Sequence, residues 1–404
     1  MKRFFKSLSA VLTAASVFVF SAVVYGNGYF PDEIDVSAQG SEYSNGIYSV
    51  ESKETVKALS FTNSDGGYKA TVKAFDMIPV KNVNVSSVKR RYVGVGGDVF
   101  GIKLYTKGVM VVKIDAVDSN GEQSPARIAD IRCGDSITHV NGSVLINTDD
   151  FISAIENSGG KELALTVERD GEKLLLKLNP TVSESGRYRA GLWVRDSSAG
   201  IGTVTFYDNE NMVFAGLGHG VCDVDTGKIM PLSGGEAVKA TVTGFYKSSS
   251  GDPGELCGVF SETALGGLRV NSVTGVYGTL NNSADAKQMP VALESEVKEG
   301  KAQIIATIDG EGPRYYDVQI TKVYPASGSE ERNLIIKITD KDLLARTGGI
   351  LQGMSGSPII QDSMLVGAVT HVFVNDPTQG YGIFAKRMLE TQDRYFGEIK
   401  QEAA

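Results

Sequence analysis

The sequence predicts a mainly β protein of two or three compact domains, and three observations carry this prediction. The chain has 404 residues, more than a single compact domain usually contains. It holds 47 glycines against 11 prolines, and many Val and Thr residues stand in short alternating runs. Such runs, broken by glycine, are typical of strands joined by turns. Helical periodicity is scarce after residue 180 and returns only at about residues 388–399.

The composition is ordinary for a globular protein, with 42% hydrophobic and 22% charged residues. The net charge is −8, and the only basic cluster is at residues 89–91. Binding to nucleic acid therefore has little electrostatic support. The three cysteines cannot all pair with one another, so we expect no disulfide framework from Cys133, Cys222 and Cys257.

The first residues have the pattern of a targeting segment. Basic side chains among the first six residues precede a nearly uncharged run at residues 8–25. We expect residues 1–26 to be a signal or a membrane anchor: small residues at 21–26 would suit cleavage, and retention is the alternative. Residues 27–91 are expected to form a leader or small β region.

Residues 92–180 have the element order of a small α+β domain. The expected elements are two strands, a short helix, a strand, a longer helix and a hairpin, at residues 100–104, 109–114, 125–129, 137–142, 148–157 and 163–178. Asn141-Gly142 is a turn signal, Thr148 can cap the longer helix, and Gly159-Gly160 can end it.

This arrangement resembles PDZ domains, particularly the circularly permuted kind found in bacterial proteases. The resemblance implies that the backbone around Phe100, Gly101 and Ile102 accepts the end of a peptide by strand addition, opposite the helix at 148–157. We therefore expect protein or peptide partners at this groove.

The search for a general base is short because the chain has three histidines. His139 lies on a strand of the PDZ-like region, and His371 lies in the apolar run at 366–374. His219 lies in Gly216-Leu217-Gly218-His219-Gly220, where glycines leave space around the imidazole and let backbone approach closely. His219 is the predicted base. The three histidines are widely separated and do not have the spacing of metal ligands, so we expect no metal and no cofactor.

A candidate nucleophile lies in the sequence Gly353-Met354-Ser355-Gly356-Ser357-Pro358. Glycines around a serine allow a tight loop that exposes the hydroxyl and turns backbone N–H groups inward, as acyl transfer requires. The loop resembles the nucleophile loop of chymotrypsin-fold serine proteases, which implies that the N–H groups of Gly353 and Ser355 form the oxyanion hole. The order of His219 before Ser355 agrees with that fold and differs from the order in α/β-hydrolases.

The residues alone do not decide which acid would orient the histidine. Carboxylates near the two candidates are found at Asp223, Asp225, Asp340, Asp342 and Asp376. Asp223 is close to His219 along the chain, and Asp376 lies in an Asn-Asp-Pro turn where a local capping role is available.

Several motifs in the same order resemble the SpoIVB peptidase family, the stage IV sporulation serine proteases of endospore formers. These motifs are Phe30-Pro31-Asp32-Glu33-Ile34, the PDZ-like region, and residues 191–196, 199–202, 216–220, 352–358 and 370–377. The resemblance implies a chymotrypsin-like double β-barrel over residues 181–404, with the catalytic acid at Asp340.

The resemblance also implies a biological role. The protein would be exported across the forespore inner membrane into the space between forespore and mother cell, and would cleave itself. It would then cleave a membrane-bound regulator of an intramembrane protease, so that a late sigma factor is activated.

Two other function classes compete with the serine endopeptidase. A non-catalytic PDZ scaffold with a protease-like domain explains the PDZ-like region but leaves His219 among its glycines unexplained. A cysteine peptidase using Cys222 or Cys257 is disfavoured because neither cysteine lies in a comparable loop.

Overall fold

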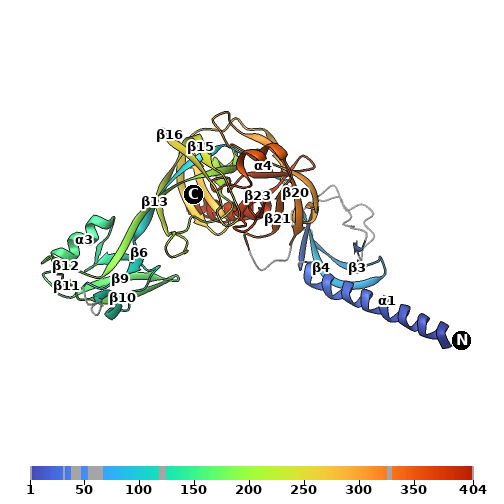
Figure 1. The fold of residues 1–404 in the computed structure, drawn as a ribbon, viewed down its shortest axis with the longest axis horizontal. Coiled ribbons are helices and arrows are strands. Elements are labelled where there is room, and N and C mark those ends of the chain that lie inside the picture. Colours follow the sequence, from blue (N-terminus) through green and yellow to red (C-terminus); the bar gives the residue numbers. More distant parts are fainter. Residues whose placement is uncertain are drawn as a thin grey trace.

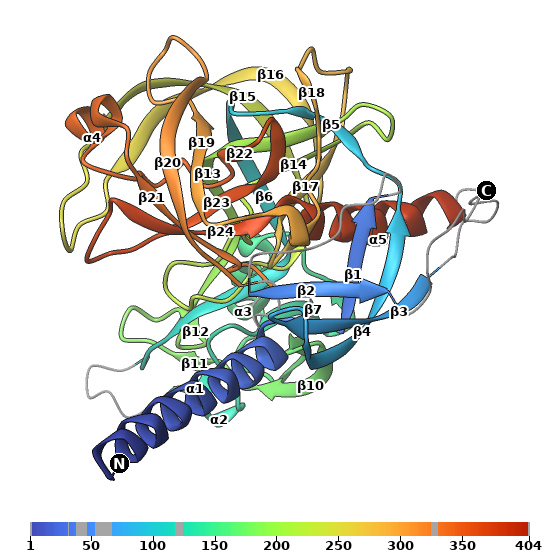
Figure 2. The same cartoon turned by 90° about the vertical axis from the view of Figure 1, so that its right-hand side faces the viewer.

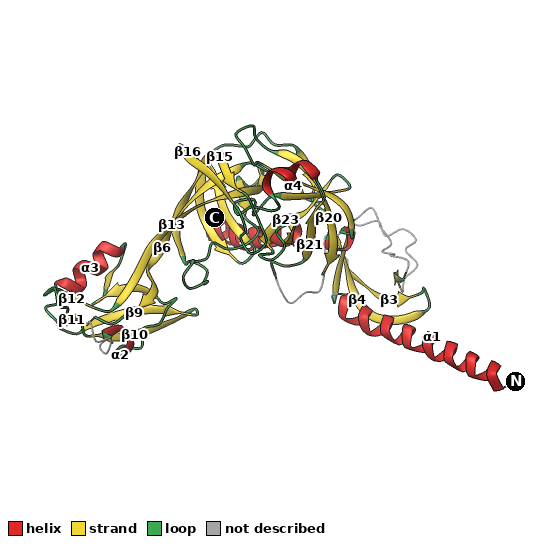
Figure 3. Cartoon of the chain, viewed as in Figure 1, coloured by secondary structure: helices red, strands yellow, loops and turns green. Residues whose placement is uncertain are grey.

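The computed structural model describes residues 2–30, 32–37, 47–52, 67–117, 124–324 and 330–402. Figure 1 shows an elongated molecule with three parts in a row: an N-terminal helix and sheet, a central pair of barrels, and a small domain at the far end. Strands make up most of the central barrels and of the far domain, whereas a long helix lies beside the strands of the N-terminal part, as Figure 3 shows. The expectation of a mainly β chain is therefore confirmed.

The N-terminal part is a long helix beside a four-stranded sheet (Figure 2). The helix α1 (Lys2–Tyr29) contains an apolar stretch, Val11–Tyr29, of 19 residues with mean hydropathy 1.5, long enough to cross a membrane. The sheet has the order β1-β4-β3-β2 and consists of β1 (Glu33–Ser37), β2 (Tyr48–Ser52), β3 (Gly67–Ala74) and β4 (Ile78–Val88). The expected leader region thus contains this sheet, although Pro31 and residues 38–46 and 53–66 lie outside the described residues.

The first barrel is a closed ring of six strands in the order β6-β15-β16-β17-β14-β13, because β6 and β13 also pair with each other. Its strands are β6 (Val99–Ile114), β13 (Leu192–Asp208), β14 (Val213–Gly216), β15 (Leu232–Tyr246), β16 (Glu255–Ser272) and β17 (Gly275–Leu280). Phe100, Phe214 and other large apolar side chains fill its core. Two short strands, β5 (Tyr92–Val95) and β18 (Gln288–Pro290), extend the sheet from β13.

The second barrel is also a closed ring of six strands, in the order β19-β20-β21-β24-β23-β22. The strands are β19 (Gly300–Ala306), β20 (Arg314–Val323), β21 (Leu334–Ile338), β22 (Pro358–Gln361), β23 (Met364–Val372) and β24 (Gln379–Phe384). A short 3-10 turn, η1 (Glu294–Glu296), precedes it, α4 (Lys341–Thr347) lies between β21 and β22, and α5 (Ala385–Glu402) ends the chain. The two rings confirm the expected double β-barrel.

In sequence, the PDZ-like domain lies between β6, the first strand of the first barrel, and β13, the second. It contains α2 (Pro125–Ile128), β7 (Ser136–Val140), β8 (Ser143–Val144), α3 (Thr148–Glu156), β9 (Leu163–Arg169), β10 (Glu172–Leu178), β11 (Thr181–Val182) and β12 (Tyr188–Arg189). The long strands β6 and β13 enter both the first barrel and this domain. The expected range of 92–180 therefore differs at both ends: it begins in the barrel and stops before β13. The cap of α3 is Asn147, one residue before the expected Thr148.

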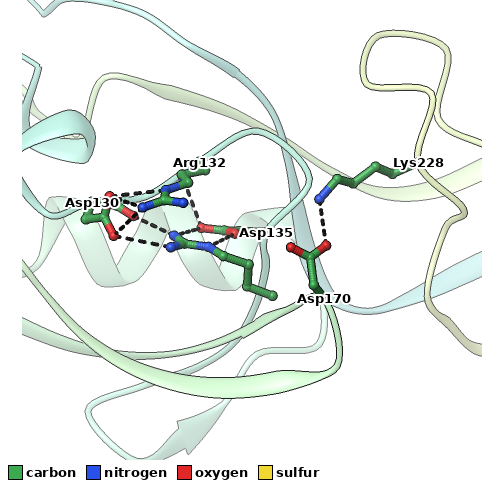
Figure 4. A network of polar contacts seen from close by, with 6 residues as sticks. Asp130, Arg132, Asp135, Asp170 and Lys228 are labelled. Atoms are coloured by element: carbon green, nitrogen blue, oxygen red, sulfur yellow. Dashed lines mark hydrogen bonds and ion pairs between the residues drawn. The ribbon is translucent and has the colours of Figure 1, made fainter.

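Ion pairs join the PDZ-like domain to the loop that follows His219 (Figure 4). Lys228 in this loop donates to Asp170 of the β9–β10 turn at 3.0 Å. Near the start of β13, Arg195 pairs with the buried Asp223 and, at 2.9 Å, with Asp225. These contacts help to fix the PDZ-like domain relative to the first barrel, because they join its side of the molecule to a loop of that barrel.

Candidate active site

The predicted nucleophile and base lie in loops of different barrels, and both loops are bonded to the same strand. Ser355 lies in the loop between α4 and β22, and His219 follows β14. Strand β13 connects the two loops: the Thr203 N–H donates to the Ser355 carbonyl at 2.9 Å, and the Thr203 carbonyl accepts from the Leu217 N–H at 3.2 Å. The structure thus brings together two sites that are 136 residues apart (355 minus 219).

The nucleophile loop has the conformation that its glycines predict. Gly353 has φ +96° and Gly356 has φ +95°, a region that side chains rarely adopt. A Cβ at Gly356 would lie 2.0 Å from the Thr203 carbonyl oxygen and 2.5 Å from the Leu217 nitrogen. Only glycine fits this close approach of backbone to backbone.

The same loop presents two free N–H groups. Within the described part of the chain, the N–H groups of Gly353 and Ser355 donate to no protein acceptor, whereas Met354 N–H bonds to the Leu351 carbonyl at 3.1 Å. The Gly353 carbonyl is held by the Thr203 hydroxyl at 2.9 Å. An alternation of free and bonded N–H groups fits an oxyanion hole, where two donors must await the developing charge.

The Ser355 hydroxyl donates to the Thr370 carbonyl at 2.6 Å, at the end of β23. Ser357, two residues further on, is fully buried and its hydroxyl has no partner among the described residues. Of the two serines, Ser355 is therefore the one that is partly accessible beside the His219 loop.

His219 is held in one tautomer by its own neighbour. Its Nδ1 lies 2.9 Å from the Gly220 carbonyl oxygen. A carbonyl can only accept, so Nδ1 carries the proton and Nε2 is left as the basic nitrogen. Burial lowers the pKa of His219, against the opposing effect of the Gly220 hydrogen bond. The imidazole is therefore neutral near pH 7, as a general base requires.

The structure does not bring Asp340 to His219, contrary to the expected triad. Asp340 is the N-cap of α4: its carboxylate accepts from the N–H groups of Leu343 at 2.8 Å and Asp317 at 3.3 Å. An aspartate directly before a helix satisfies the first free N–H groups of that helix, which explains the placement. In the described residues, no carboxylate forms an ion pair with His219.

The two alternative acids also have local roles. Asp223 accepts from Arg195 and from the N–H groups of Asp225 and Thr226. Asp376 accepts from Thr378 and from the Gln379 side chain, within the turn that the sequence indicated.

Phe100, Gly101 and Ile102 do not form the peptide groove, and this expectation is corrected. They lie in β6 inside the first barrel, where Gly101 pairs with Ile201 of β13 on one side and Val238 of β15 on the other. Both strand edges are occupied, so no peptide can add there. The alternating pattern does indicate a strand, but the strands that pair with it come from distant parts of the chain.

A cleft in the PDZ-like domain instead lies beside the start of β13. It has a volume of about 760 Å³ and is lined by α3, the β11–β12 hairpin and residues 191–194. Residues 192–194 pair with β6 on one edge, and in the described residues no strand pairs with their other edge. Phe151 and Ile155 of α3 supply an apolar wall. A free strand edge opposite a helix is the geometry that strand addition uses.

Three further residues lie at the site, and their residue types alone do not predict this position. Thr203 and Thr370 are buried threonines in strands, a common residue type in that setting. The apolar run around His371 predicts an ordinary strand residue, yet its ring lies against that of His219, with centroids 4.5 Å apart. The motif at 370–377 was the one available signal.

The two barrels, with the predicted base on the first and the predicted nucleophile on the second, define the class: a chymotrypsin-like serine endopeptidase that carries a PDZ domain. Residues 186–389, about half of the chain, match the SpoIVB peptidase S55 family, and residues 117–169 match the PDZ domain family. This protein belongs to the SpoIVB peptidase S55 family.

Comparisons with solved structures give distant similarities. The Rv3671c protease of M. tuberculosis in its active form is 14% identical, with 50% of this chain and 75% of that chain covered and a TM-score of 0.28. The HtrA-type protease AlgW with a decapeptide is 12% identical (49% and 54% covered, TM-score 0.30). The PDZ domain of an SdrC-like protein of Listeria monocytogenes is 19% identical (22% and 87% covered, TM-score 0.19).

One curated relative is similar over a shorter stretch. A protein of Lactococcus lactis subsp. lactis, named as a zinc metalloprotease, is 30% identical over 93 residues, which is 23% of this chain and 22% of that protein. Among the residues described here, no group of three or more His, Cys, Asp or Glu side chains is placed to hold a metal ion.

Proposed function

We propose that this serine endopeptidase acts through Ser355 as nucleophile and His219 as base, with the N–H groups of Gly353 and Ser355 as oxyanion hole. The observation that carries the proposal is the pair of free N–H groups in a glycine loop that is bonded through Thr203 to the His219 loop. The neutral tautomer of His219 supports it, because Nε2 is available to accept a proton.

The chemistry follows from these positions. The Ser355 hydroxyl leaves the Thr370 carbonyl and gives its proton to His219 Nε2, while Oγ attacks the scissile carbonyl carbon. The oxyanion accepts from the two N–H groups, and the imidazolium then protonates the leaving amine. Water repeats the sequence on the acyl-enzyme and frees Ser355.

The PDZ domain and the N-terminal helix support a substrate at or near a membrane. The free edge of β13 is a site for an extended peptide, and α1 can act as signal or anchor, compatible with export or membrane association. Together with the family, these features support cleavage of the protein itself and of a membrane-bound regulator of an intramembrane protease. The site of action would be the space between forespore and mother cell, where the cleavage activates a late sigma factor.

The test uses two serines of one loop. We expect Ser355→Ala to abolish labelling by a fluorophosphonate, hydrolysis of a p-nitrophenyl ester, and self-cleavage of the purified chain. Ser357→Ala is the matched control: its hydroxyl is buried without a partner among the residues that the structure describes, so removing it should leave all three activities.

Self-cleavage by purified Ser355→Ala would contradict the assignment. Absence of labelling and hydrolysis in the wild-type chain would favour the alternative, a PDZ scaffold whose protease-like domain is not catalytic.

A further inference from the structure

Near the end of strand β23, two consecutive residues contact the two predicted catalytic groups. The Thr370 carbonyl accepts from the Ser355 hydroxyl at 2.6 Å. The next residue, His371, has its ring 4.5 Å from that of His219, with an angle of 35° between the planes. A Cβ placed on Gly218 would lie 3.0 Å from the Thr370 side chain, so the chain leading to His219 packs directly on this strand end. His371 is thus part of the same packed unit as Ser355 and His219.

His371 also has unused hydrogen-bonding capacity. Its Nδ1 is buried and has no partner among the described residues. A buried polar atom without a partner costs free energy, and such atoms in a native fold often mark a functional position.

The charged groups around His371 come from the segment before β21. Arg332 lies over the Tyr381 ring at 5.2 Å, and its Nε lies 3.5 Å from the Glu331 carboxylate, whose pKa is raised mainly by burial. The Glu331 backbone carbonyl accepts from the Thr370 hydroxyl at 3.4 Å. Burial, followed by His219 and Arg332, lowers the pKa of His371 to about 4. Above about pH 4 its ring is therefore neutral, and His219 can become positively charged without a second cation stacked on it.

No carboxylate forms an ion pair or hydrogen bond with His219 among the described residues, whereas the ring of His371 lies against it. We propose that His371 is the positioning residue of the base: it packs against His219, holds the ring toward Ser355 and stabilises the imidazolium that forms when Ser355 loses its proton. The proton moves from Oγ to Nε2 of His219, while Nδ1–H stays on the Gly220 carbonyl, so His371 itself neither gains nor loses a proton. This inference rests on the proposed serine mechanism.

The experiment compares His371→Gln, which removes the ring that lies against His219, with His371→Phe, which keeps a flat ring there. We expect kcat for a p-nitrophenyl ester to fall roughly 10²-fold in His371→Gln, with KM little changed, as for loss of support to a general base. His371→Phe should retain more of the activity, because an aromatic ring stays against the imidazolium. The acid limb of kcat/KM should move to lower pH in His371→Gln, because the imidazolium of His219 loses its stabilising neighbour.

His139→Gln is the matched control, since this histidine lies on β7 of the PDZ-like domain and its Nδ1 faces the Thr138 hydroxyl at 2.9 Å. It should leave both kcat and the acid limb unchanged. A soluble His371→Gln variant with wild-type kcat and an unmoved acid limb would overturn the inference. Fluorophosphonate labelling of the wild type separates this failure from failure of the serine mechanism, because only the latter abolishes labelling of the unmodified chain.

Discussion

Strand β13 contributes one stretch to the PDZ-like groove and another to the active site, and the two stretches differ in how their edges are used. At residues 192–194, β13 has one paired edge and one free edge beside the apolar side of α3. At Thr203 and Thr205 the strand is fully buried, and both hydroxyls hold carbonyls of the nucleophile loop, at 2.9 Å and 2.8 Å. A free edge makes a strand a binding surface, whereas saturated hydrogen bonding makes it a rigid support. The catalytic region should therefore be far more sensitive to small changes than the groove.

The largest effect is expected at Gly356, where the support and the nucleophile loop touch. In Gly356→Ala the new Cβ would meet the Thr203 carbonyl at 2.0 Å at a backbone φ of +95°. The loop must move, so we expect ester hydrolysis to fall at least about 10³-fold, comparable to loss of an oxyanion donor. Gly312→Ala is the control, because Gly312 has φ +94° but no atom within 4 Å of the added Cβ. Equal losses in both variants would show that backbone strain alone, and not the contact with β13, is responsible.

An intermediate effect is expected at Asp340, whose carboxylate caps the helix that leads into the nucleophile loop. Asp340→Ala should cost about 1 kcal/mol of stability through the lost cap and lower the ester hydrolysis rate roughly tenfold. Asp340→Asn and Asp340→Ser keep a capping side chain and should stay within about twofold of the wild type. The measurements are thermal unfolding and single-turnover rates. A loss of roughly 10⁴-fold in Asp340→Asn would instead restore Asp340 as the orienting acid of a triad.

The smallest effect on chemistry is expected in the PDZ-like groove. Ile152 lines the cleft and is 43% exposed, so Ile152→Asp should not unfold the domain. We expect ester hydrolysis to remain unchanged while the KM for a protein substrate rises about tenfold, because strand addition contributes affinity and not bond cleavage. Ile146→Asp is the control: Ile146 is 74% exposed and lies outside the cleft. Loss of ester hydrolysis in Ile152→Asp would show that the groove and the catalytic loop are coupled through β13.

The features that could be predicted from the sequence are those with local signals. Glycines at 353 and 356 are required by the positive φ angles of the nucleophile loop, and glycines around residue 219 leave space beside the imidazole, so Ser355 and His219 were identifiable from short motifs. Alternating runs and turn signals predicted the hairpins and the mainly β architecture for the same reason.

The contacts between distant residues became apparent only in the folded chain. Residues 100–102 form a strand, as the alternating pattern predicts. They cannot bind a peptide, because β13 and β15 pair with both edges of this strand. Asp340 precedes a helix and is used as its cap, while His371, which resembles an ordinary residue of an apolar strand, lies against His219. Strand partners and ring contacts between residues 98 or more positions apart depend on how the barrels close, and no local pattern encodes that closure.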